Sequence, residues 1–260
     1  TITGYQELRA LIIGKLYSSN DLAFYDKGKQ FPNLVVTNIN TSISAVLFPK
    51  LAQEQDEISK VKYITRQSVK FSAYIMSPIM LGLAAVAEPF ISVVLTDKWL
   101  PCVHLLQLFC FFYLFQPIQT ANTQAIKALG RSDLALKLEI IRDIIQLISL
   151  VCVMWISVDA IVISMAVLSL LFVFINGYPN IKLINYSIKE QVEDFIFPLL
   201  MSGAMMIIVL LVGNLHINKI ILLLIQVVTG GAIYVFLSVI TKNSEFKYFI
   251  NLLTAKLHSK

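Results

Sequence analysis

Apolar runs of about 20 residues recur along the 260-residue chain, and they constrain its fold more than any other feature. A run of this length spans the hydrocarbon core of a bilayer as an α-helix. The composition agrees, since 57% of the residues are hydrophobic and 14% are charged, whereas soluble domains have about 45–50% apolar and about 25% charged residues. Because one soluble core could not bury this much apolar surface, the sequence predicts an all-α, polytopic transmembrane helix bundle.

Six runs are long enough to form complete spans. They cover residues 71–95, 102–126, 138–156, 160–178, 195–212 and 220–240. Two weaker runs precede them, residues 2–17, which we interpret as the outer part of a truncated span, and residues 33–49. The latter run is apolar but carries Thr37, Asn38, Asn40, Thr41, Ser42 and Ser44. Because lipid does not solvate such side chains, it should pack inside the bundle or line a cavity. We expect about eight spans, the first truncated, in a membrane domain covering residues 1–243.

Lys and Arg residues alternate between the connections, which orients the bundle. Cytoplasmic connections are rich in these residues. Every second connection is basic, and together the basic connections hold 15 of the 21 positive charges: Lys50, Lys60, Lys62, Arg66, Lys70, Lys127, Arg131, Lys137, Arg142, Lys182, Lys189, Lys242, Lys247, Lys256 and Lys260. The connections between them hold only Lys98 and Lys219. The pattern predicts that residues 50–70 and the C-terminus are cytoplasmic.

One segment departs from this rule. Residues 17–33 are expected to form an outer loop, yet they contain Lys27 and Lys29. Asp21 and Asp26 balance these charges, but acidic residues contribute little to topology.

The last 17 residues, 244–260, are predicted to be a cytoplasmic amphipathic tail. Apolar side chains recur there at helical spacing, at Phe246, Phe249, Ile250, Leu253 and Leu257. Such a helix either lies on the inner membrane surface or docks on the cytoplasmic ends of the bundle.

Motifs of enzymes and cofactor sites are missing. The sequence has no Walker loop, no GxGxxG, no GxSxG and no CxxC or HExxH spacing. It therefore predicts no catalytic residue, no metal site and no cofactor, and the net charge of +5 is attributed to membrane topology rather than to nucleic acid. The chain opens without Met or a basic region followed by an apolar stretch, so we expect no signal peptide and interpret it as part of a longer protein.

Three stretches carry a family resemblance. They are YSSNDLAFYDKGKQFPNLVVTNINTSISAVLFPKLAQEQDE (17–57), AEPFISVVLTDKWLPCVHLLQLF (87–109) and NTQAIKALGRSDLALKLEIIR (122–142). The first resembles an aromatic-Tyr-x-basic-Gly pattern with a following Pro, then a polar-spotted helix that ends in Phe-Pro-x-Leu. Together they resemble the polysaccharide transport (Wzx-type, O-antigen flippase) branch of the multidrug/oligosaccharidyl-lipid/polysaccharide exporter superfamily.

The resemblance implies a fold of 12–14 spans in two lobes, of which this chain supplies the C-terminal lobe from span seven onwards. It implies a non-enzymatic flippase of the bacterial inner membrane that moves an undecaprenyl-diphosphate-linked oligosaccharide during polysaccharide or lipopolysaccharide biosynthesis. Its partners would be that substrate, membrane lipid and the polysaccharide polymerase machinery. A cation-coupled drug or metabolite antiporter of the same superfamily is the alternative, followed by a membrane polysaccharide polymerase or ligase.

Arg9 is the first candidate for substrate binding. It lies within the truncated span, where a guanidinium is costly and usually faces a cavity or a partner. Its fork-shaped donors suit a diphosphate or an acidic sugar. An ion pair with Glu7, or a position nearer the interface, would explain the residue equally.

Two polar stripes at helical spacing are the other candidates. One comprises Gln116, Gln119, Thr120 and Thr123, together with Lys127, and the other Thr37, Asn38, Thr41 and Ser44. Amides and hydroxyls suit sugar hydroxyls, although they also hold membrane helices together. Pro117 and Pro78 are expected to kink their helices.

Carboxylates raise the question of ion coupling. Glu88 precedes Pro89 towards the outer end of its span and is a candidate for coupling to protons or sodium, or else an interfacial residue. Glu139, Arg142 and Asp143 are expected to form an ion-pair cluster at a cytoplasmic helix end.

Overall fold

The computed structural model of the chain describes residues 2–215, 217–243 and 245–247, with side chains from residue 8 onwards. This part of the chain is helical and contains no strand. The helices are α1 (Ile2–Leu16), α2 (Ser19–Gln53), α3 (Ile58–Ala85), α4 (Ala87–Val94), the 3₁₀-helix η1 (Asp97–Cys102), α5 (Val103–Leu114), α6 (Gln116–Ala128), α7 (Ser132–Val153), α8 (Val158–Leu183), α9 (Ile188–Val212) and α10 (Lys219–Ile240).

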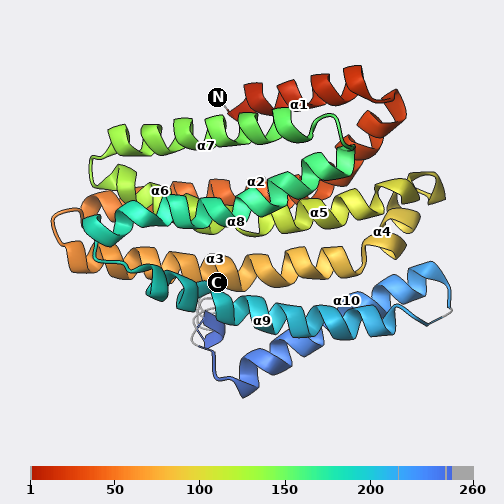
Figure 1. Ribbon diagram of the computed structural model, residues 1–260. Helices are drawn as coiled ribbons and strands as arrows, with labels where there is room; N and C mark the ends of the chain where they lie inside the picture. Colours follow the sequence, from red (N-terminus) through yellow and green to blue (C-terminus); the bar gives the residue numbers. More distant parts are fainter. Residues whose placement is uncertain (1, 216, 244, 248–260) are drawn as a thin grey trace.

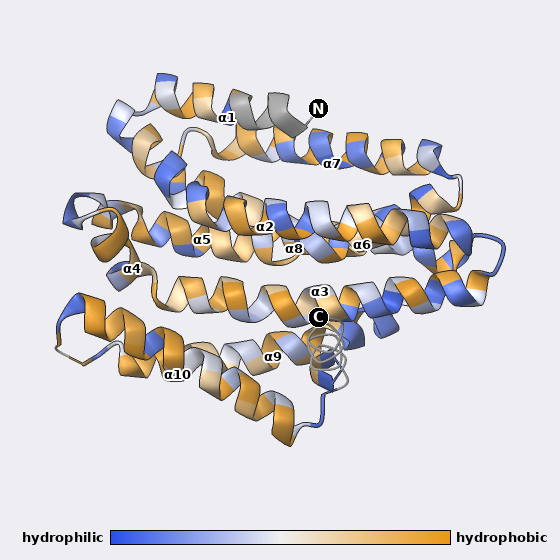
Figure 2. Ribbon diagram, turned by 180° about the vertical axis from the view of Figure 1, so that it is seen from behind, coloured by the Kyte–Doolittle hydropathy of each residue, from blue (hydrophilic) through white to orange (hydrophobic). Residues whose placement is uncertain are grey.

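The long helices run roughly antiparallel in one bundle, and the chain reverses at its two ends (Figure 1). Helices α1 and α7 lie along one side, α9 and α10 lie along the other, and α2, α3, α5, α6 and α8 fill the middle. We call the end where α2 meets α3 and α6 meets α7 the basic end, because Lys and Arg gather there. Figure 2 shows hydrophobic residues dominating α4 and α10, and hydrophilic ones gathering towards the basic end.

Within the described residues, six helical segments are long and apolar enough to cross a membrane. They are α2, α3, the segment from η1 to α6, α8, α9 and α10. The two other expected spans fall short of this standard, since α1 has only 15 residues and α7 carries Lys137, Glu139, Arg142 and Asp143. The chain is a multi-pass membrane protein by this measure, and the total of eight spans stays a prediction.

Two expected connections are helical instead. Helix α2 begins at Ser19 and runs for 35 residues, so Lys27 and Lys29 lie on a helix and not in an outer loop. The Ser18 hydroxyl accepts a hydrogen bond from the Asp21 amide, and the Asp21 carboxylate accepts one from the Ser18 amide, a capping box that starts the helix early. Similarly, α3 begins at Ile58, which places most of the basic residues of segment 50–70 on its first turns. Hydropathy marks the lipid-facing part of a helix and not its polar ends, which explains both errors.

Two of the expected spans are each interrupted by a break between helices. The span expected at 102–126 breaks at Phe115, directly before Gln116 and Pro117, because Pro cannot donate the backbone hydrogen bond that would continue α5. Helix α3 continues through Pro78 and ends at Ala85, after which α4 begins.

An aromatic core holds α2 against α5. Tyr25 contacts Phe109 at 5.2 Å between ring centres, and Tyr113 stacks on Phe109 at 6.1 Å. Gly28 lets the two helices approach, since a Cβ there would lie 2.9 Å from Leu105 Cβ. Most of the expected amphipathic tail, residues 244–260, lies outside the described residues.

Candidate functional site

A cavity of about 360 Å³ lies between α1, α2, α5, α6, α7 and α8. Most of its wall is polar, which is unusual for the interior of a membrane bundle. Amides line it at Asn33, Asn40, Gln116, Gln119, Gln124, Gln146 and Asn176, and hydroxyls line it at Thr37, Thr120, Thr123 and Ser169. The charged lining residues are Arg9, Lys127, Glu139, Arg142 and Asp143.

Arg9 is buried in the cavity wall, with 3% of its surface exposed. Its Nη2 donates to Gln146 Oε1 on α7 at 2.9 Å, and its Nη1 lies 2.9 Å from Met165 Sδ on α8. The guanidinium therefore joins the short helix α1 to two neighbours while it lines the cavity. The side chain of Glu7, the other partner considered for Arg9, lies outside the described side chains.

One group of lining residues joins helix to helix. Thr120 Oγ1 on α6 donates to Asn40 Oδ1 on α2 at 3.2 Å. On the other side of α6, Gln119 Nε2 donates to the Ser169 carbonyl oxygen on α8 at 2.9 Å, and Asn176 Nδ2 donates to Gln119 Oε1 at 3.4 Å. These bonds make α6 the polar centre of the packing, as expected for membrane helices.

Another group of lining residues has no such bonds. Within the part of the chain that the structure describes, no hydrogen bond or ion pair engages the side chains of Asn33, Gln116, Lys127, Arg142 and Asp143. Four of these side chains are half-buried and Lys127 is exposed. Because unbonded polar groups are costly in a dry apolar interior, we expect water or a polar ligand to solvate this wall. We call these five residues the open set.

The sequence-predicted residues divide between the cavity and the surface of α2. Arg9, Thr37, Gln116, Gln119, Thr120 and Thr123 line the cavity. Three others do not. Asn38 and Thr41 are exposed and bond to carbonyl oxygens of their own helix, and Ser44 Oγ accepts from Gln124 Nε2 at 2.9 Å. Binding by any of these residues stays a prediction.

Glu88 lies away from the cavity. It is exposed in the first turn of α4, at the end of the bundle opposite the basic end. A role in ion coupling stays a prediction for this residue.

Sequence reasoning missed much of α7. Glu139, Arg142, Asp143 and Gln146 line the cavity, whereas an ion-pair cluster at a helix end was expected for the first three. Their spacing of three, four and seven residues places them on one helix face, which was the available signal. The partners across the cavity could not be identified from spacing alone.

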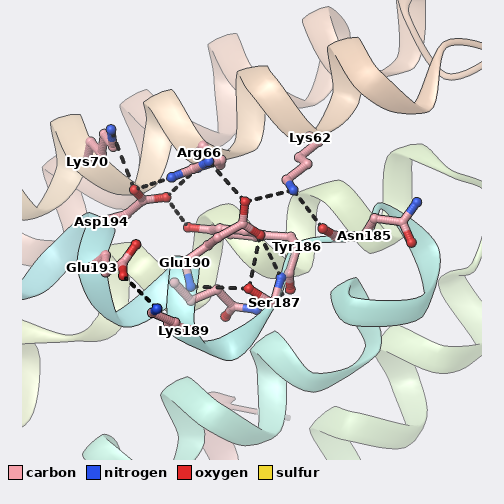
Figure 3. A network of polar contacts seen from close by, with 11 residues as sticks. Lys62, Arg66, Lys70, Asn185, Tyr186, Ser187, Lys189, Glu190, Glu193 and Asp194 are labelled. Carbon is pink, nitrogen blue, oxygen red and sulfur yellow. Dashed lines mark hydrogen bonds and ion pairs between the residues drawn. The ribbon is translucent and has the colours of Figure 1, made fainter.

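A second polar region joins α3 to α9 near the basic end (Figure 3). Arg66 binds Asp194 through two parallel hydrogen bonds, Nε to Oδ2 at 2.8 Å and Nη2 to Oδ1 at 2.9 Å. Tyr186 donates its hydroxyl to Asp194 Oδ2 at 2.8 Å, and the Asp194 side chain is only 2% exposed. Burial, followed by the charge of Asp194, raises the pKa of Tyr186 and keeps its hydroxyl protonated as a donor.

Further ion pairs extend this region towards the surface. Arg66 Nη1 donates to Glu190 Oε1 at 3.1 Å, and Lys62 Nζ lies 2.8 Å from the same oxygen. Lys70 Nζ lies 3.5 Å from Asp194 Oδ1. We call Lys62, Arg66, Lys70, Tyr186, Glu190 and Asp194 the α3–α9 clamp. Its charges are satisfied within the protein, so it is a structural joint rather than a binding site.

Comparison with known proteins agrees with the fold and the resemblance. Residues 1–104 match a family described as polysaccharide biosynthesis protein. The chain is 28% identical over 125 residues to the teichuronic acid biosynthesis protein TuaB of Bacillus subtilis, an alignment that covers 48% of this chain and 26% of the relative. It is 24% identical over 135 residues to the lipopolysaccharide biosynthesis protein WzxC of Escherichia coli, covering 52% of this chain and 27% of the relative.

The same fold occurs in a solved structure of the lipid II flippase MurJ in an inward closed conformation. The TM-score is 0.72 at 16% identity, and the match covers 87% of this chain and 48% of that one. The chain thus spans less than half of the length of each of these proteins. Taken together, the family match over residues 1–104, the relatives and the fold support the polysaccharide exporter and flippase superfamily that the sequence resemblance predicted.

Proposed function

We propose that this chain is part of a flippase of the bacterial inner membrane that moves an undecaprenyl-diphosphate-linked oligosaccharide from the inner to the outer leaflet. The observation that carries the proposal is a polar cavity inside a membrane bundle whose open set has no protein partner among the described residues. Its superfamily and its likeness in fold to a lipid II flippase support transport rather than bond chemistry.

The chemistry of the wall suits a sugar. Neutral amides and hydroxyls match sugar hydroxyls, which both donate and accept hydrogen bonds. The volume of about 360 Å³ lies at the small end of ordinary ligand sites, about 300–1,000 Å³, so it fits a segment of an oligosaccharide. The lipid tail would stay in the bilayer, while movement of helices around the cavity would alternate access to it.

Arg9 would hold the anionic part of the substrate. A guanidinium forms paired, charge-assisted hydrogen bonds with phosphate or carboxylate oxygens. Lys127 and Arg142 add two further cations to the same wall. With Glu139 and Asp143 present, the lining keeps one excess positive charge, which favours an anionic substrate.

The orientation follows from the basic end. We infer that this end, with the connection between α2 and α3 and the C-terminus, is cytoplasmic. A cysteine introduced at Glu57, which lies in that connection, should react with a membrane-impermeant maleimide only from inside. Labelling of intact cells from outside would reverse the orientation.

One observation favours a second function, cation-coupled antiport. Asp143 lines the cavity and belongs to the open set, and a carboxylate inside a membrane bundle can exchange protons or sodium. Substrate transport that responds to a pH or sodium gradient, and loses this response in Asp143→Asn, would favour coupling.

The main test is an Arg9→Gln substitution in the full-length protein. We expect translocation of a fluorescent undecaprenyl-diphosphate-linked oligosaccharide in proteoliposomes to fall at least about tenfold, the effect of losing one charge-assisted contact. Arg131→Gln is the matched control, because Asp133 at the exposed surface is the only ion-pair partner of Arg131 among the described residues. Equal translocation by wild type, the control and Arg9→Gln would refute the proposal.

A further inference from the structure

The chain turns back towards the bundle after α10 (Figure 1). Lys242 has a φ of 50°, a left-handed conformation that residues other than Gly rarely adopt. The Asn243 amide donates to the Ser238 carbonyl oxygen at 3.1 Å, which is the bond that closes a Schellman turn. This turn ends α10 and reverses the direction of the chain.

A new helical turn starts directly after the reversal. Asn243 Oδ1 accepts hydrogen bonds from the amides of Glu245 at 2.8 Å and Phe246 at 3.2 Å, so Asn243 serves as an N-cap. The Lys247 amide donates to the Asn243 carbonyl oxygen at 3.3 Å, which continues the helical pattern. Because Asn243 is only 5% exposed, the cap is itself packed inside the protein.

Phe246, in this turn, packs on a seam between α3, α9 and α10. It lies against the hydrophobic cluster that includes Tyr74 on α3, Met201 on α9 and Tyr234 on α10. Hydrogen bonds also join α3 to α10 in this cluster. The Tyr74 hydroxyl donates to Ser238 Oγ at 2.9 Å, and the Tyr234 hydroxyl donates to the Tyr74 carbonyl oxygen at 2.8 Å. Phe246 therefore adds an apolar contact to the seam that holds α10 against α3.

The burial of Glu245 separates the two places where the tail could lie. A helix on the inner membrane surface puts its apolar side chains into lipid and keeps its charged side chains in water. Glu245 is instead 9% exposed, and it lies close enough to Tyr74 and Tyr234 for its charge to act on both side chains. The burial of this carboxylate beside the packed Phe246 indicates docking on the bundle.

We propose that residues 243–247 begin an intramolecular strap, in which the C-terminal tail docks on the seam and fastens α10 to α3. The tail itself is the occupant of the seam, because its later apolar residues continue the helical spacing that starts at Phe246, namely Phe249, Ile250, Leu253 and Leu257. The strap does not depend on the proposed function, since it concerns how the last spanning helix is held and not what the cavity binds.

Hydrogen exchange of the full-length protein, measured by mass spectrometry, tests the strap. In nanodiscs of zwitterionic lipid alone, the amides of residues 245–247 should exchange slowly, because docking on the bundle needs no anionic headgroup. Phe246→Ser should accelerate this exchange about tenfold, the effect of losing one partly buried aromatic side chain, and should also accelerate exchange in the last turn of α10. Slow exchange that requires anionic lipid would overturn the strap, because a helix on the membrane surface behaves in this way.

Matched variants separate the strap from general loss of structure. Phe236→Ser makes the same chemical change on the exposed side of α10, where Phe236 is 63% exposed, and should leave exchange at residues 245–247 as in wild type. Asn243→Ala removes the cap and should accelerate exchange, whereas Asn243→Ser keeps a capping oxygen and should restore slow exchange. Wild-type exchange in both Phe246→Ser and Asn243→Ala would also overturn the strap.

Discussion

The cavity and the α3–α9 clamp are both polar, yet they differ in how their groups are bonded. In the clamp, Asp194 accepts hydrogen bonds from Arg66 and Tyr186, and Glu190 pairs with two cations. In the cavity, the open set has no protein partner within the described residues. The comparison teaches that polarity alone does not identify a binding site in a membrane bundle. The number of bonds already made within the protein separates a joint from a site.

The largest effect is expected in the clamp. Arg66→Met removes the guanidinium that binds the buried Asp194 through two hydrogen bonds. Breaking such a buried ion pair costs about 3–5 kcal/mol. Denaturant unfolding of the purified protein in detergent should show a decrease in the free energy of unfolding near the lower limit of this range. The reason is that Tyr186 and Lys70 still contact the carboxylate. Lys60→Met, which removes only exposed ion pairs, is the control. If both variants unfold at the same denaturant concentration, the clamp does not stabilise the fold.

A smaller loss is expected for Tyr186→Phe, about 1.5 kcal/mol for one hydrogen bond to a charged group. Since burial raises the pKa of Tyr186, its hydroxyl contribution is fully present below the unfolded-state pKa of about 10. It is lost only as the pH rises through the higher folded-state pKa. The stability difference between wild type and Tyr186→Phe should therefore stay constant from about pH 6 to about pH 9. A difference that shrinks within this range would contradict the assignment.

The smallest stability effect is expected in the open set. Gln116→Leu removes no bond to a described residue and should change the free energy of unfolding by less than about 0.5 kcal/mol, while translocation of the fluorescent substrate falls. Gln119→Leu, three residues along the same helix, removes a hydrogen bond to α8 and should cost about 1 kcal/mol. Reversed results, with Gln116→Leu less stable and fully active, would remove the distinction between bonded and open residues.

Sequence reasoning found the membrane bundle and part of the cavity. Apolar runs located most helices, and the spacing of Gln116, Thr120 and Thr123 placed them on one face of α6. It could not separate Gln119, which joins helices, from Gln116, since the difference depends on a residue 50 positions away.

The α3–α9 clamp could not be predicted from the sequence for the same reason. Arg66 and Asp194 are 128 residues apart, and the Arg66 side of the pair was interpreted as part of a basic connection. Helix lengths were predicted wrongly where polar residues extend a helix beyond its apolar run, as at the start of α2.

The length of α2 bears on the proposed passage of a charged headgroup across the membrane. Thirty-five residues make a helix about 52 Å long, whereas the hydrocarbon core is about 30 Å thick. The excess must be taken up by tilt or by protrusion into both headgroup layers. One continuous helix is therefore long enough to reach from the phosphate plane of one leaflet to that of the other, and in the proposed flippase an anion would stay beside this helix throughout its passage. In bilayers of different thickness, different residues of α2 would lie at the two headgroup layers, where the proposed passage begins and ends.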